Sequence, residues 1–224
     1  WWEASVSSLG ESREEESWKH VKLLARGHTA KVYCAWNNAE SKVIIKVMDL
    51  LVTRGDGRAR LDAAFRNEIR MLRRLASAPH IVRLRDAIPH HATNTLVLEY
   101  TGVMEPLKRV ENADEAAMYL RMLVEALDAC HARQIVHMDV KPGNVLVNRQ
   151  RRLLRLIDFG YATVYRHGKA QTTFSGTPTY KAPELILHVP IYDYAVDMWA
   201  VGVMAARLVL GSGLFSDAFV APRG

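Results

Sequence analysis

The chain has 224 residues, and hydrophobic residues make up 49% of it and charged residues 24%. These values are ordinary for a globular protein, and they exclude an intrinsically disordered or low-complexity chain. The 30 Lys and Arg residues outnumber the 24 Asp and Glu residues, which gives a net charge of +6 and describes either a solvated basic surface or an affinity for anionic partners. A nucleic-acid partner is not expected, because no basic patch interleaved with aromatic residues is visible.

The two cysteines and the apolar runs indicate the compartment. Cys34 and Cys130 lie far apart in the sequence, so neither a disulfide framework nor a zinc site is predicted. The longest apolar run near the C-terminus, residues 198–206, is too short to cross a bilayer, and no signal peptide is recognised. We therefore expect a soluble intracellular protein without membrane contact, in a reducing compartment such as the cytoplasm or the nucleus.

The N-terminal part of the chain is predicted to be rich in strands after a leader, residues 1–17, that is rich in Ser and Glu. Short β-branched stretches predict strands, of which the first three form an antiparallel meander. These stretches are residues 21–24, 31–36, 42–48, 81–87 and 95–100. One helix interrupts them, because apolar residues recur at helical spacing over residues 62–75.

The C-terminal part is predicted to be mainly helical, with long helices over residues 114–133 and 194–210. This change of character divides the chain into two lobes, residues 18–100 and 101–224, in the α+β class. The second helix is apolar on nearly every side, so we expect it to be buried all round. Because only residues 211–224 follow it, we expect an incomplete C-terminal lobe that further chain or a covering or regulatory partner chain completes.

The most informative stretch is residues 135–147, in which polar residues interrupt a strand-like run. Asp139, Lys141 and Asn144 share a tight Pro-Gly loop and supply a proton acceptor, a phosphate counter-charge and a metal ligand. Asp158 ends a second apolar strand. Taken alone, Asp158 is equally well explained by an ordinary strand-ending turn. Taken together, the two loops predict a Mg²⁺ site.

These motifs stand in an order that resembles the eukaryotic protein kinase superfamily, from residue 18 to the end of the chain. The motifs are V-I-I-K at 43–46, Glu68 on the following helix, H-M-D-V-K-P-G-N at 137–144, D-F-G at 158–160, G-T-P-T-Y-K-A-P-E at 176–184 and D-M-W-A-V-G at 197–202. The resemblance implies a bilobal protein kinase fold, with an antiparallel-sheet N-lobe that carries one long helix and a mainly helical C-lobe.

Within the superfamily the sequence is most similar to the casein kinase 2 catalytic subunit. Residues 153–169 and 192–204 carry this similarity, supported by residues 26–33. That subfamily usually has Trp where Phe159 stands and Gly where Ala182 stands. The resemblance implies an enzyme, an ATP-dependent serine/threonine kinase with protein substrates and with ATP and Mg²⁺ as cofactors, and Lys141 with G-T-P-T-Y fits the Ser/Thr-specific pattern.

The resemblance also implies a role for individual residues. Lys46 contacts the α- and β-phosphates and is held by an ion pair with Glu68. Asp139 orients the substrate hydroxyl and accepts its proton, while Lys141 balances the charge of the moving γ-phosphate. Asn144 and Asp158 bind Mg²⁺.

The nucleotide is expected to lie between the lobes, with adenine held by apolar side chains and by the backbone of residues 99–101. The residues assigned to nucleotide binding are Gly27, Val32, Ile44, Lys46, Leu98, Glu99, Thr101, Leu146 and Ile157.

Several departures from the family pattern bear on activity. The phosphate-covering loop keeps Gly27 but has Ala25 and Ala30 at its outer positions, so we expect weaker nucleotide binding or a stiffer loop. Met138 replaces an Arg that in many kinases pairs with a phosphorylated activation segment, so we expect no regulation by that route.

Two functions therefore stay open, an active kinase and a pseudokinase that acts as a structural or interaction subunit. The intact set of Lys46, Glu68, Asp139, Asn144 and Asp158 favours the active kinase. A preference for acidic substrates also stays open, because Phe174 and Pro178 stand where that subfamily has basic residues.

Overall fold

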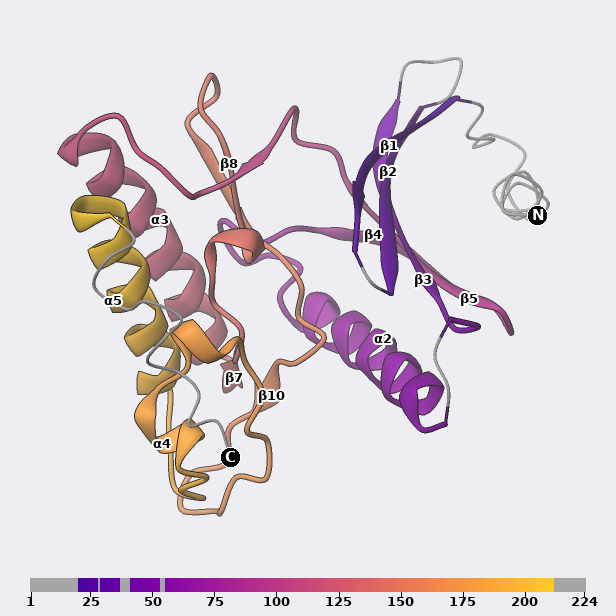
Figure 1. The fold of residues 1–224 in the computed structure, drawn as a ribbon. Helices are drawn as coiled ribbons and strands as arrows, with labels where there is room; N and C mark the ends of the chain where they lie inside the picture. The colour runs from indigo at the N-terminus through magenta and orange to yellow at the C-terminus, as the bar shows by residue number, and fades with distance from the viewer. Residues whose placement is uncertain (1–19, 28, 37–40, 53–54, 212–224) are drawn as a thin grey trace. The chain divides into compact units, whose positions relative to one another are not determined.

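The computed structural model describes residues 20–27, 29–36, 41–52 and 55–211. The predicted leader lies outside them. The described chain divides into two compact units, one formed by the residues up to 65 together with 83–101, the other by residues 66–82 together with those from 102. Antiparallel strands and long helices occur together (Figure 1), so the predicted α+β class is confirmed.

The first unit is built on a five-stranded antiparallel sheet in the order β1-β2-β3-β5-β4. Its strands are β1 (His20–Arg26), β2 (Ala30–Trp36), β3 (Lys42–Asp49), β4 (Leu84–Pro89) and β5 (Thr93–Glu99). The predicted meander is thereby confirmed. The strand predicted over 81–87 is observed as β4, which starts at Leu84. Ile81 belongs to the second unit and forms an isolated bridge with Leu156 there.

Strand register sorts the side chains of this sheet onto two faces. One face carries Tyr33, Ala35, Val43, Ile45 and Val97, which form a buried apolar cluster. Because side chains alternate along a strand, the residues between them lie on the opposite face. There Val32 pairs with Lys46, and Ile44 pairs with Leu98.

Helix α2 (Gly57–Arg74) begins in the first unit and continues into the second. It starts five residues before the predicted residue 62. The residues just before that position, Arg58, Ala59 and Arg60, are good helix formers, and Arg60 N–H already donates to the Asp56 carbonyl. The helix buries Phe65, Met71 and Leu72 almost completely.

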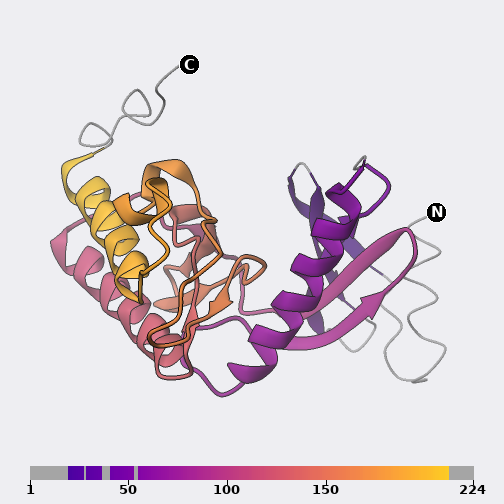
Figure 2. The ribbon, with the colours of Figure 1, turned by 90° about the horizontal axis from the view of Figure 1, so that it is seen from below.

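The second unit is mainly helical, as predicted, with α3 (Ala113–His131) and α5 (Ala195–Leu210) lying side by side in both ribbon views (Figures 1 and 2). Its short strands are β6 (Glu105–Pro106), β7 (Ile135–Val136), β8 (Val145–Asn148), β9 (Leu153–Leu156) and β10 (Thr163–Val164). They pair in the orders β6-β8-β9 and β10-β7. The remaining elements are the single turns η2 (Pro142–Asn144), η3 (Pro178–Tyr180) and α4 (Pro183–Ile186).

Helix α5 is not buried on all sides as predicted. One face packs inward through Val196, Ala200, Val203 and Met204. The other face is open, and Trp199 keeps 43% of its surface exposed. An apolar sequence therefore covers both a packed face and an exposed one in this helix.

Cys34 and Cys130 are both buried and free. Burial, together with the nearby Asp197 carboxylate, raises the pKa of the Cys130 thiol far above its usual value, which makes this thiol a poor nucleophile. Among the described residues, no helix has the length and apolar character that crossing a membrane requires.

Candidate active site

The loop between β7 and β8 carries the predicted proton acceptor, and His137 fixes its shape. His137 Nε2 lies 3.1 Å from the Ile157 carbonyl, which can only accept a hydrogen bond. The ring proton therefore sits on Nε2, and Nδ1 is left to accept the Asp139 N–H at 3.3 Å. His137 is fully buried. Its imidazole connects Ile157, just after β9, to the start of the loop that carries Asp139.

Asp197 of α5 anchors the same loop from the other side. Its carboxylate accepts the N–H of His137 at 2.8 Å and the N–H of Met138 at 2.9 Å, and His131 Nε2 lies 2.9 Å away. Met138 has φ +71°, a left-handed conformation that disfavours residues other than glycine. The buried carboxylate holds this strained turn in place, a role that the sequence analysis did not assign to Asp197.

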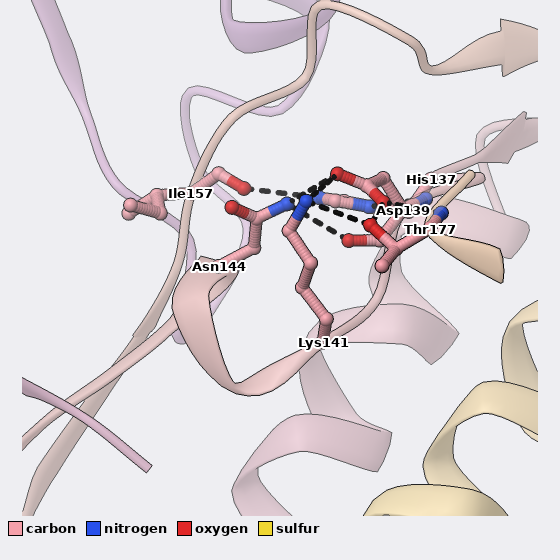
Figure 3. Close-up of polar contacts among 6 residues, drawn as sticks. All are labelled: His137, Asp139, Lys141, Asn144, Ile157 and Thr177. Carbon is pink, nitrogen blue, oxygen red and sulfur yellow. Dashed lines mark hydrogen bonds and ion pairs between the residues drawn. The ribbon is translucent and has the colours of Figure 1, made fainter. Parts of the chain in front are cut away.

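The Asp139 carboxylate is enclosed by donors, as Figure 3 shows. Its Oδ1 accepts the Thr177 N–H at 3.0 Å and the Thr177 hydroxyl at 2.7 Å. Its Oδ2 accepts Asn144 Nδ2 at 2.9 Å and Lys141 Nζ at 2.7 Å. These contacts use the acceptor sites of both carboxylate oxygens. Asp139 is only 5% exposed, so the contacts lie in a nearly dry environment.

Thr177 lies in the G-T-P-T-Y motif and had no predicted role of its own. The structure places it at the centre of the site. Its hydroxyl donates to Asp139 and accepts Lys141 Nζ at 2.8 Å. The preceding Gly176 makes this approach possible. It has φ +123°, and a Cβ there would lie 2.6 Å from the Met138 carbonyl oxygen, so no other residue fits without moving the backbone.

The predicted Mg²⁺ ligands, Asn144 and Asp158, have the oxygen donors that this ion prefers. Asn144 Nδ2 is engaged by Asp139, both at the side chain and at the backbone carbonyl, which leaves the amide oxygen as the donor atom for a cation. Asp158 has φ +66°. The described residues contain no group of three or more His, Cys, Asp or Glu suited to a metal.

The backbone that follows Asp158 is held from two sides. Phe159 is fully buried and meets His137 edge-on, with ring centroids 4.7 Å apart. Asn67 Nδ2 lies within 3.3 Å of three carbonyl oxygens in this stretch, those of Phe159, Gly160 and Ala162. Asn67 was not among the predicted site residues, and its one signal in the sequence was its place directly before Glu68.

The predicted nucleotide residues of the first unit gather on one face of its sheet. Val32, Ile44, Lys46 and Leu98 share this face by register, and the fully buried Leu96, which pairs with Lys46, joins them unpredicted. Gly27 N–H donates to the Ala30 carbonyl at 2.8 Å, and Glu99 ends β5 beside Thr101. Neither Ala25 nor Ala30 has a positive φ, so alanine is compatible with the backbone at both positions.

The remaining predicted residues lie on the second unit. These are Glu68 on α2, which is 2% exposed, Leu146 on β8 and Ile157 after β9. The predicted ion pair between Lys46 and Glu68 would join the two units, and so would adenine held by the nucleotide residues of both units. Both features stay predictions.

Met138 has a packing role where a family arginine was expected. It belongs to a buried cluster with Val136, Ala182, Leu185 and Tyr192. Ala182 has φ −65°, a conformation open to any residue, so alanine fits this backbone without strain.

Hydrogen bonds to backbone carbonyls hold the segment that contains Thr172, Thr173 and Ser175. The Tyr192 hydroxyl donates to the Thr173 carbonyl, and burial, aided by Asp197, raises the Tyr192 pKa to about 12, so the phenol keeps its proton. Lys181 Nζ donates to the Phe174 carbonyl at 2.8 Å. Gln171 is buried and donates to the carbonyl of Lys169 at 2.8 Å.

We expect the joint substitution of Thr172, Thr173 and Ser175 by Ala to change phosphate transfer by less than about threefold, which is below 1 kcal/mol. No arginine at position 138 awaits a phosphate on these residues, and the segment is already held. The rate of transfer from ATP measures this. The matched variant is Thr177→Ala in the same segment, which removes a hydroxyl that touches Asp139 and lowers the rate. A large loss in the triple variant would contradict the expectation.

A family model described as the protein kinase domain matches residues 18–220 of the chain. The match covers both units and every predicted site residue.

Proposed function

This chain belongs to the protein kinase family, and on that premise we propose that it is a Mg²⁺- and ATP-dependent serine/threonine kinase that resembles casein kinase 2. The observation that carries the proposal is the contact of an aliphatic hydroxyl, that of Thr177, with the Asp139 carboxylate and the Lys141 ammonium at 2.7 and 2.8 Å. A serine or threonine of a protein substrate offers the same group in the same size.

The proposed reaction uses these residues as follows. The substrate hydroxyl takes the place that the Thr177 hydroxyl has beside Asp139 Oδ1 and donates its proton there as its oxygen bonds to the γ-phosphorus of ATP. The bond from that phosphorus to the bridging oxygen breaks, and ADP leaves. Lys141 already lies 2.7 Å from Asp139 Oδ2, from where it can balance charge on the transferred group.

The ligands present fit Mg²⁺, which when bound offsets the negative charge of the phosphates. Asn144 offers an amide oxygen whose partner nitrogen is fixed by Asp139, and Asp158 offers a carboxylate. On the first unit, Lys46 lies among Val32, Ile44 and Leu98 on one sheet face, which suits a cation that meets phosphates beside an apolar site for adenine.

The departures that favoured a pseudokinase remove none of these groups. Met138 belongs to an apolar cluster, and Ala25 and Ala30 lie in strands with ordinary backbone angles. The active kinase is therefore the better-supported function, with protein substrates as its partners.

The test is transfer of labelled γ-phosphate from ATP to three versions of one peptide that differ only in a Ser, Thr or Tyr acceptor, with and without Mg²⁺. We expect Mg²⁺-dependent labelling of the Ser and Thr peptides. Labelling of Tyr alone would overturn the acceptor assignment, and nucleotide binding without labelling would identify a pseudokinase. Flanking Glu or Lys residues in the same peptide decide whether acidic substrates are preferred.

We expect ATP with Mg²⁺ to raise the melting temperature more than ATP alone, because a ligand that binds the folded state more tightly stabilises it more. Asp158→Asn should lose the extra increment from Mg²⁺ while keeping the shift from ATP. Thermal melts with and without metal measure both effects, with the exposed Asp128→Asn as the control. Equal shifts with and without Mg²⁺ in the unmodified chain would count against Asn144 and Asp158 as ligands.

A further inference from the structure

A pocket of about 580 Å³ lies in the first unit and is lined by residues from the first turns of α2 and from the turn of the β4–β5 hairpin. Its polar lining comes from Arg58 and Asp62 of α2 and from His90, His91 and Asn94 of the hairpin, and Leu50 lines it as a buried apolar residue. None of these residues belongs to the proposed catalytic or nucleotide sets. The pocket therefore has no role in the proposed reaction.

Hydrogen-bond donors gather at the outer side of this pocket. Arg58 Nη2 donates to the His91 carbonyl at 2.8 Å, which draws the guanidinium toward the hairpin. The ring centroids of His90 and His91 lie 3.9 Å apart. His90 Nδ1 accepts the Ala92 N–H at 3.3 Å, which places the proton of the neutral ring on Nε2. The guanidinium and two imidazoles thus lie together around one opening.

The inner side of the pocket is polar but internally matched. Asn94 is 1% exposed, and its Nδ2 donates to Asp62 Oδ1 at 3.0 Å. Asp62 is the one acidic side chain among the described residues that line the pocket. The first turn of α2 carries no acidic residue, so the positive end of its dipole adds to the charge of Arg58.

The shape selects among anionic ligands. Arg58, His90 and His91 are all exposed, so the pocket cannot enclose most of a free small molecule, as ligand sites usually do. An open pocket suits a side chain that projects from a peptide, because the rest of the peptide stays outside it. A phosphoryl group offers three strong acceptor oxygens and nearly two negative charges, against two oxygens and one charge for a carboxylate, and a guanidinium fork binds it in two-point geometry.

We propose that this pocket binds a phosphorylated Ser or Thr side chain of a partner protein, with Arg58 as the main contact and His90 and His91 as further donors. Leu50 and Pro89 give the methylene group of the ligand an apolar surface. The site is a docking site for a phosphorylated segment, formed by the first unit alone.

The test follows the imidazole signals of His90 and His91 by NMR in the full chain, without nucleotide, as a phosphoserine tripeptide with blocked ends is added. His90→Gln and His91→Gln assign the two signals. We expect both signals to shift with the phosphopeptide, and Arg58→Gln to weaken binding at least about tenfold. Arg58→Lys keeps the charge but loses the forked guanidinium. Its affinity for the phosphopeptide should lie between those of the unmodified chain and Arg58→Gln.

Arg60→Gln is the matched control, because Arg60 is exposed on the same helix but does not line the pocket. It should leave the affinity unchanged. Three results would overturn the proposal: imidazole signals that do not move, an affinity that Arg58→Gln leaves intact, or a Glu tripeptide that binds as tightly as the phosphopeptide. Equal affinity for inorganic phosphate would show a site for a free anion instead of a docking site. No turnover is measured, so the outcome does not depend on the proposed kinase activity.

Discussion

Replacing Asp139 with Asn should lower the rate of phosphate transfer by about 10²- to 10⁴-fold, the usual contribution of a positioned general base. The amide keeps the size of the carboxylate but cannot take the proton of a substrate hydroxyl. Nucleotide affinity should hardly change, because Asp139 contacts Thr177, Asn144 and Lys141 and was assigned no nucleotide contact. Steady-state kinetics and a separate nucleotide titration measure the two quantities.

Asp128→Asn is the matched control for this variant, since Asp128 is an exposed carboxylate on α3. It should transfer phosphate at the rate of the unmodified chain. Near-normal transfer by Asp139→Asn would mean that another group accepts the proton, and the role given to Asp139 would have to be withdrawn.

The second large effect is expected at Asp197, where Asn should reduce both stability and transfer. The buried carboxylate accepts two backbone N–H groups and faces His131. An amide turns one acceptor into a donor and leaves at least one buried N–H without an acceptor, at a cost of about 1–3 kcal/mol. At about 2–4 °C per kcal/mol for a chain of this size, the melting temperature should fall by several degrees. Transfer falls too, because Met138 and the start of the Asp139 loop lose their anchor.

Asp193→Asn separates this effect from a general loss of carboxylates. Asp193 is exposed just before α5, and its side chain accepts the Ala195 N–H at 2.7 Å. It should lower the melting temperature less than Asp197→Asn and leave transfer nearly unchanged. Equal melting of Asp197→Asn and the unmodified chain would show that the anchor contributes little.

Periodicity and residue type predicted the elements well where they were strongest. The β-branched run at 42–48 and the apolar positions of 114–133 indicated β3 and α3 to within a few residues. The start of α2 was missed because Gly55 and Gly57 suggested a loop, although arginine and alanine between them and Asp62 favour a helix. The open face of α5 was missed because composition does not say which side of an apolar helix packs.

The candidate site was predictable in its parts but not in its assembly. Asp139, Lys141 and Asn144 stand within six residues of one another and were found together. Thr177 lies 38 residues from Asp139 and reaches it only through the turn at Gly176. Asp197 had a signal, a carboxylate inside an otherwise apolar helix, since such a group must find buried donors. Nothing in the sequence named the donors, because they are backbone groups of His137 and Met138.

The Asp197 contacts also order the events of folding. The residues that they join are 60 and 59 positions apart, and closing so long a loop costs entropy that only packed structure repays. During synthesis, the segment around Met138 leaves the ribosome well before Asp197 exists to hold it. We therefore expect the turn at Met138 to gain its anchor only when α5 packs against α3.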